Sequence, residues 1–206
     1  MAMTIGEIAG ILDQMEFKYA KRDDHTIALF MRMKTYENPE NSEKSLLLVA
    51  QLLEEGEYFQ LFAPKAFVVK GEHQDAFLRA CAIIQWRTKL IQFEWDRNDG
   101  EVRPVIEFPL EDAKLTRKQF ERCIQGMCSI LDEFFPKLKK AADEGVVDFP
   151  DEKVPGDIGT LLDVARRLAS EGTATEEQTR ALEELLRRIR EGGGPSGPDG
   201  SAPREL

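Results

Sequence analysis

The chain has 206 residues and a net charge of -10, and its 38 acidic and 28 basic side chains form no basic run. Because a phosphate-tracking protein usually carries a basic stripe, we expect no direct nucleic-acid contact and an electrostatic preference for a basic protein partner. The N-terminus lacks the pattern of a signal peptide, and no apolar run reaches the roughly 18 residues of a membrane span. The three cysteines form no C-x-x-C pair, which favours a reducing cytoplasm over disulfides or a zinc knuckle.

The first segment predicts a helix followed by a hairpin. Thr4 and Glu7 have the spacing of a capping box, and the apolar residues from there to Met15 form a single stripe, which is typical of a helix that lies on a sheet. Residues 17–21 and 26–35 then alternate around a short acidic turn, as two paired strands do.

A second hairpin is expected next. Residues 46–53 and 57–63 flank Glu55 and Gly56, and glycine tolerates the positive φ of a tight turn. The run 46–53 is apolar enough to form a buried helix instead. The tight turn and the alternation after it favour a strand.

The stretch from His73 to Asp96 changes from a helical to a strand period. Its apolar residues recur every three or four positions through Trp86, which indicates a largely buried helix. From Ile91 to Asp96 the apolar residues alternate, as in a half-buried antiparallel strand.

The last strand and helix of this region both contain a proline. Residues 102–108 predict a strand, in which Pro104 lacks an amide hydrogen and is expected at an edge or a bulge. Thr116 and Gln119 form a second capping box before a long apolar-faced helix, which Pro136 is expected to kink or break.

These elements predict an α+β fold, an antiparallel sheet with helices packed on one face, followed by a C-terminal helical pair. We expect a domain over residues 1–145, a linker over 146–156, a helical hairpin over 157–191 and a disordered tail over 192–206, the last from its glycine and proline content.

The stretches LLVAQLLEEGEYFQLFAP and LIQFEWDRNDGEVRPVIEFPLEDAKLT resemble the YbjN-like family of bacterial proteins, which is similar in fold to type III secretion chaperones. The resemblance covers about residues 4–142. It implies a small, often dimeric, non-enzymatic protein that holds a segment of another protein, with stress-related roles in the family. It transfers no functional residue, because the family has no invariant chemical site.

The sequence offers no pattern for catalysis, a metal or a cofactor. His25 and His73 have no cysteine or serine in a nucleophile motif nearby. The paired carboxylates lack the spacing of metal ligands and partner histidines, so solvated surfaces explain them better. The glycines form no phosphate-binding loop. We therefore expect no enzyme and no cofactor.

The sheet, in contrast, has an excess of aromatic residues. If Ile27 and Leu29 face the helices, Phe30 faces away, and in the strand after Gly56 either Phe59 or the pair of Tyr58 and Phe62 does too. The C-terminal helical pair, a second copy or a partner segment could cover this face. As partner-binding residues we predict Phe30, Tyr58 and Phe62.

Two functions remain open. The favoured one is a homodimeric, chaperone-like or adaptor protein that binds a segment of a partner protein. The alternative is a regulatory domain that senses a small ligand between sheet and helices. The predicted dimer interface consists of apolar residues of the central helix and the following strand: Phe77, Cys81, Ile84, Trp86 and Phe93.

Overall fold

The computed structural model describes residues 2–149 and, beyond them, Thr175, Arg180, Glu184 and Arg187. The chain divides into two compact units, Met1–Phe149 and Pro150–Leu206. The predicted helical pair at 157–191 and tail at 192–206 lie outside the described residues, apart from those four. The fold and the candidate site belong to the first unit.

This unit is an α+β structure, as expected. Its helices are α1 (Ile5–Gln14), α2 (Gln74–Arg87) and α3 (Arg117–Glu144), and η1 (Glu54–Gly56) is a 3-10 turn. Its strands are β1 (Ala20–Lys21), β2 (Thr26–Arg32), β3 (Ser45–Leu53), β4 (Tyr58–Phe62), β5 (Phe67–Val68), β6 (Gln92–Trp95) and β7 (Glu101–Pro109). All pairs are antiparallel in the order β1-β2-β3-β4-β7-β5, and β6 also pairs with β7.

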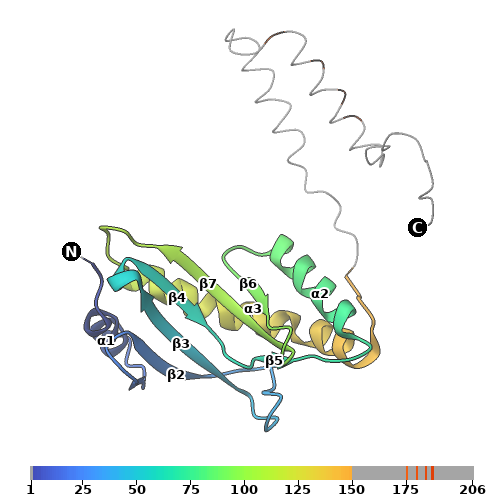
Figure 1. Ribbon diagram of the computed structural model, residues 1–206, viewed down its shortest axis with the longest axis horizontal. Helices are drawn as coiled ribbons and strands as arrows, with labels where there is room; N and C mark the ends of the chain where they lie inside the picture. Colours follow the sequence, from blue (N-terminus) through green and yellow to red (C-terminus); the bar gives the residue numbers. More distant parts are fainter. Residues whose placement is uncertain (1, 150–174, 176–179, 181–183, 185–186, 188–206) are drawn as a thin grey trace. The chain divides into compact units, whose positions relative to one another are not determined.

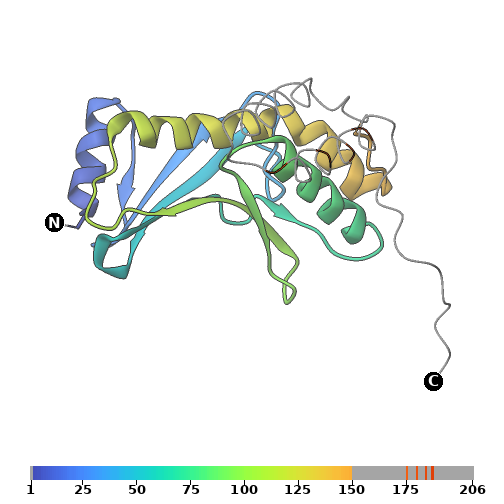
Figure 2. The same ribbon diagram turned by 90° about the horizontal axis from the view of Figure 1, so that it is seen from above.

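The helices cover one side of the sheet, which we call the inner face (Figure 1). In Figure 2, α3 runs along the strands, with α1 near one of its ends and α2 near the other. Both predicted capping boxes are present. The hydroxyls of Thr4 and Thr116 accept from the backbone N–H of Glu7 and Gln119, whose side chains accept from the cap residues in return.

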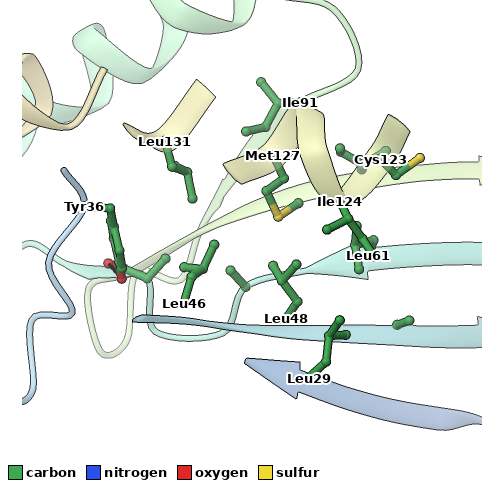
Figure 3. Packing of buried hydrophobic residues seen from close by; sticks show 14 of the residues in the cluster. Leu29, Tyr36, Leu46, Leu48, Leu61, Ile91, Cys123, Ile124, Met127 and Leu131 are labelled. Carbon is green, nitrogen blue, oxygen red and sulfur yellow. Dashed lines mark hydrogen bonds between the residues drawn. The ribbon is translucent and has the colours of Figure 1, made fainter. Parts of the chain in front are cut away.

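The inner face and α3 form the core. Figure 3 shows Ile124, Met127 and Leu131 of α3 directed at Leu48 and Leu61 of the sheet. All five side chains are fully buried. Since burial of one such side chain contributes about 1.5 to 3 kcal/mol, this contact holds α3 on the strands.

Of the two outcomes predicted for Pro136, a kink or a break, the break does not occur. The helix continues for 28 residues with Pro136 inside it. Pro136 is exposed, while Phe134, Leu138 and Ala141 extend the buried stripe past it. Packing on both sides of the proline therefore outweighs the lost backbone hydrogen bond.

The edge position predicted for Pro104 is also wrong, because β7 pairs with β4 on one side and β6 on the other. The carbonyl of Pro104 accepts from the N–H of Ala63 at 3.1 Å, so the ring nitrogen faces the same side. There β4 has ended at Phe62 and β5 begins only at Phe67. The missing amide hydrogen of Pro104 thus lies beside the gap between β4 and β5, where no strand is paired with β7 on that side.

Residues 146–149, which composition assigns to the start of a linker, belong to the first compact unit. The ring of Phe149 stacks on that of Phe134. The cations of Arg87 and Lys137 lie 5.2 and 4.8 Å from its centroid. Phe149 therefore attaches the end of this unit to α2 and α3.

Candidate functional site: the outer face of the sheet

The side of the sheet turned away from α1, α2 and α3 is called the outer face here. Strand alternation places Ile27 and Leu29 of β2 in the core and Phe30 on the outer face, where its side chain is 72% exposed. In β4, Phe59 is fully buried on the inner side. Tyr58 and Phe62 consequently lie on the outer face, which settles the alternative left open by the sequence.

An apolar row crosses four strands of the outer face. Phe30 of β2 lies opposite Leu47 of β3, and Val49, two residues farther along β3, lies opposite Phe62 of β4. Phe62 is in turn opposite Val105 of β7. Val49 and Val105 are buried by their neighbours, Leu47 and Phe62 are half-buried, and Phe30 stands most exposed. We call these five residues the apolar row.

Charged and polar groups surround this row. The guanidinium of Arg103 lies 4.9 Å from the ring centroid of Phe62 and pairs with Glu94, with 2.6 Å between Nε and Oε2. Gln60 donates from Nε2 to the carboxylate of Glu107 at 2.7 Å. Arg103 thus contacts the row at Phe62, and Gln60 and Glu107 are bonded to each other on the neighbouring positions of β4 and β7.

Tyr58 lies apart from the apolar row. It is opposite Pro109 of β7, four positions along β4 from Phe62. Partial desolvation, followed by the carboxylates of Glu107 and Glu54, raises the pKa of its phenol. Of the three predicted partner-binding residues, the structure thus brings Phe30 and Phe62 into one row and places Tyr58 on the same face beside acidic groups.

A groove of about 750 Å³ opens beside Phe30. Apolar parts of Phe30, Leu47 and Pro64 line it together with the carboxylates of Glu40, Glu43 and Glu101. We call this space the Phe30 groove. One wall of the groove is formed by the loop between β2 and β3, which could not be predicted as part of a site because its composition indicates only a polar connection. The closely spaced acids of the loop were the available signal.

The loop that forms this wall is firmly attached to α3. The carboxylate of Asp132 accepts from the backbone N–H groups of Lys34, Thr35 and Tyr36 at 2.8 to 3.1 Å. The hydroxyl of Tyr36 donates to the carbonyl of Ala66 at 2.8 Å inside the core. The base of the loop is therefore held by contacts that reach far along the sequence.

The five residues of the predicted dimer interface do not share one surface. Phe77, Cys81 and Ile84 are 0 to 3% exposed inside the first unit and cannot reach a second copy. Trp86 is 87% exposed at the end of α2. Phe93 of β6 is half-buried, and its N–H donates to Oε1 of the Gln85 side chain. A dimer interface around Trp86 and Phe93 stays a prediction.

The cysteines sit in apolar surroundings. Desolvation raises the pKa of Cys123 to about 11. Desolvation and the negative charge of Asp132 together raise the pKa of Cys128 to about 12. Burial also raises the pKa of Cys81. These thiols therefore stay protonated at neutral pH. Within residues 2–149 and the four described beyond them, no three His, Cys, Asp or Glu side chains are grouped to hold a metal ion, and no helix is long and apolar enough to span a bilayer.

No family model matches the chain, and no curated protein matches it either. Solved structures similar to it include YbjN from E. coli, at 11% identity and a TM-score of 0.46, over 64% of this chain and 91% of that one. A chain of the heterodimeric ExoU–SpcU complex from the type III secretion system of Pseudomonas aeruginosa matches at 16% identity and a TM-score of 0.41, over 66% and 98%. A chain of the ExsC–ExsE complex matches at 18% identity and a TM-score of 0.43, over 70% and 99%. Each of these three TM-scores is below 0.5.

Proposed function

We propose that the protein is a non-enzymatic chaperone-like or adaptor protein, which binds a segment of a partner protein on the outer face of its sheet. One observation carries the proposal: the apolar row crosses a face that no helix of residues 2–149 covers, and Phe30 in it is 72% exposed. An antiparallel sheet with one covered face normally presents polar residues on the other.

The apolar row is suited to protein binding because it is already ordered. Its residues belong to paired strands, so binding would cost little backbone entropy. Complete burial of a side chain such as Phe30 contributes about 1.5 to 3 kcal/mol. The rim of charged groups would supply orientation and specificity rather than most of the affinity.

A small-ligand sensor has less support. Such a site needs a cavity between sheet and helices with converging polar groups. In Figure 3 that space holds core side chains such as Leu48, Met127 and Leu131.

The proposal includes a homodimer that leaves the outer face accessible. Trp86 and Phe93 are its candidate contacts, because they are the members of the predicted set that reach the surface. Trp86 belongs to α2 and therefore lies on the helical side of the unit. A dimer formed there would not need to occupy the apolar row.

The experiment is a comparative affinity capture from the cells that make the protein, followed by mass spectrometry. The baits are the full chain, the Phe30→Ser variant and the Val146→Ser variant, which removes a 39% exposed apolar side chain at the end of the unit. We expect at least one protein to be retained by the full chain and by Val146→Ser and lost with Phe30→Ser. Identical sets of captured proteins for all three baits would contradict the proposal.

A further inference from the structure

We propose that the Phe30 groove binds an arginine side chain of the partner, within an extended segment that also carries apolar residues on the same side. This inference rests on the proposed function and specifies the chemistry of the partner. It follows from the charges of the groove, from its apolar floor and from the position of one lysine.

The groove combines an apolar floor with an acidic wall. Phe30, 72% exposed, and the half-buried Leu47 and Pro64 offer apolar surface. The described residues that line the groove supply three carboxylates and one ammonium group, that of Lys65. A long cationic side chain fits such a site, because its methylene groups can lie on the floor while its charge meets the wall.

The ammonium group of Lys65 already pairs with one carboxylate of the groove. Its Nζ lies 3.6 Å from Oε1 of Glu40, and both side chains are 63% exposed. Its backbone has a positive φ of 50° and donates from N–H to the carboxylate of Glu101 at 2.6 Å. An exposed pair at this distance is weak. Lys65 is therefore a replaceable cation that a partner would displace from Glu40.

Hydrogen bonds within the loop between β2 and β3 order the backbone of the acidic wall in the absence of a partner. The N–H of Glu40 donates to Oδ1 of Asn38 at 2.9 Å, and the N–H of Glu43 donates to Oδ1 of Asn41 at 3.0 Å. The hydroxyl of Ser45 donates to Glu43 at 3.5 Å. With the loop base held by α3, these bonds fix the backbone from which the two acids reach the groove. Planar pairing with carboxylates favours arginine over lysine in such a site.

The charge of the wider face supports the same occupant. The outer face and its bordering loop carry the acids Glu37, Glu40, Glu43, Glu94, Glu101 and Glu107 and the cations Arg32, Lys34, Lys44, Lys65 and Arg103. The excess of acids is concentrated at the groove, which is lined by Glu40, Glu43 and Glu101 and by the single cation Lys65 among the described residues. A second copy of this chain, with its net charge of -10, is electrostatically the poorer match.

The probes are three fluorescent peptides, each with three repeats of a four-residue unit: Arg-Ser-Leu-Ser, Gln-Ser-Leu-Ser or Glu-Ser-Leu-Ser. In an extended chain the first and third residues of each unit point to the same side. Binding is measured by fluorescence polarisation with the full chain at low salt. We expect the arginine peptide to bind about tenfold more tightly than the glutamine peptide, and the glutamate peptide to bind least.

Two charge-matched double variants locate the effect. Glu40→Gln with Glu43→Gln should weaken binding of the arginine peptide about five- to tenfold. Glu72→Gln with Glu133→Gln makes the same charge change at exposed positions away from the groove and should leave binding within about twofold. Lys65→Ala removes the displaced cation and should tighten binding severalfold. Thermal melts verify that each variant is folded.

Equal binding of the arginine and glutamine peptides would overturn the inference, as would equal losses in the two double variants or no gain from Lys65→Ala. If the glutamine peptide bound equally well and Phe30→Ser abolished that binding, the inference would fail while the proposed function stood. Binding of none of the peptides would also overturn the inference, and the capture experiment would then decide the proposed function separately.

Discussion

Oδ1 of Asp132 lies 2.9 Å from the backbone nitrogen of Tyr36, although 96 residues separate the two in the sequence. This contact joins a helix of the inner face to the loop that borders the outer face. The carboxylate accepts hydrogen bonds from three successive backbone N–H groups, so it fixes the backbone at the base of the loop. The outer face is thus positioned from the opposite side of the sheet.

The first prediction concerns this carboxylate. Replacing Asp132 by Ala leaves backbone donors without their acceptor and should lower the free energy of unfolding by about 1 to 3 kcal/mol, measured by urea denaturation. Glu133→Ala, at the neighbouring exposed position, is the control and should change it by less than about 0.5 kcal/mol. Equal effects of the two variants would contradict the anchoring role.

The same site predicts a dependence of stability on pH. Desolvation opposes the charge of Asp132, but hydrogen bonds from Tyr36, Thr35 and Lys34 outweigh it and lower the pKa of the carboxyl. A lowered folded pKa stabilises the fold above the unfolded value of about 3.9, and this contribution is lost as the pH falls through the folded pKa. Stability should therefore fall more steeply below about pH 4 in the full chain than in Asp132→Asn. Parallel pH profiles would contradict this.

Gly56 is predicted to be intolerant of a side chain. Its φ is +96°, and a Cβ there would lie 2.1 Å from the carbonyl oxygen of Met3, whose N–H donates to the carbonyl of Gly56. Gly56→Ala should destabilise the fold by more than about 1 kcal/mol. The matched control is Gly126→Ala in α3, where nothing lies within 4 Å of the added Cβ, and it should stabilise by about 0.5 to 1 kcal/mol. Thermal denaturation by circular dichroism measures both.

The dimer is tested by light scattering at micromolar concentration. We expect twice the chain mass of 23.4 kDa for the full chain and a shift toward a single chain for Trp86→Ser. Trp86 is 87% exposed, so its loss should leave the melting temperature of the monomer nearly unchanged. A single-chain mass for the unaltered protein would remove the dimer from the proposal, because an interface of standard size should persist at that concentration.

A chelator or common nucleotides should leave the thermal midpoint unchanged, because no motif for either ligand is present in the sequence. A ligand at 100 times its dissociation constant would add about 2.7 kcal/mol to the free energy of unfolding. A shift of several degrees with any of these additions would point to a bound ligand that the account lacks.

The sequence predicts the local features of the fold well. The caps at Thr4 and Thr116 and the strand at β3 follow from short-range patterns, and all three are present. Neither the edge position considered for Pro104 nor the break considered for Pro136 occurs. Local rules for proline are overridden where surrounding packing or a gap between strands removes their cost. The two-residue strand β5 is too short for periodicity to reveal.

The site was harder to predict for a different reason. An apolar stripe indicates that a helix face is buried but not which surface covers it. The stripe of Phe77, Cys81 and Ile84 therefore predicts a contact with a second copy, whereas the first unit itself buries all three. Phe30 was recognisable because it breaks the alternation of β2. The Phe30 groove depends on long-range contacts such as the one between Tyr36 and Asp132, which no local pattern encodes.

The central claim is that the outer face contacts another protein, and the most direct measurement is site-specific photo-crosslinking in the cells that make the protein. A photoreactive amino acid is placed at position 30, on the outer face, or at position 133, on the exposed side of α3. We expect position 30 to yield a crosslink to a different protein and position 133 to yield none to that protein. The account would be contradicted if position 30 crosslinked only to the chain itself or to a second copy, or if both positions gave the same products.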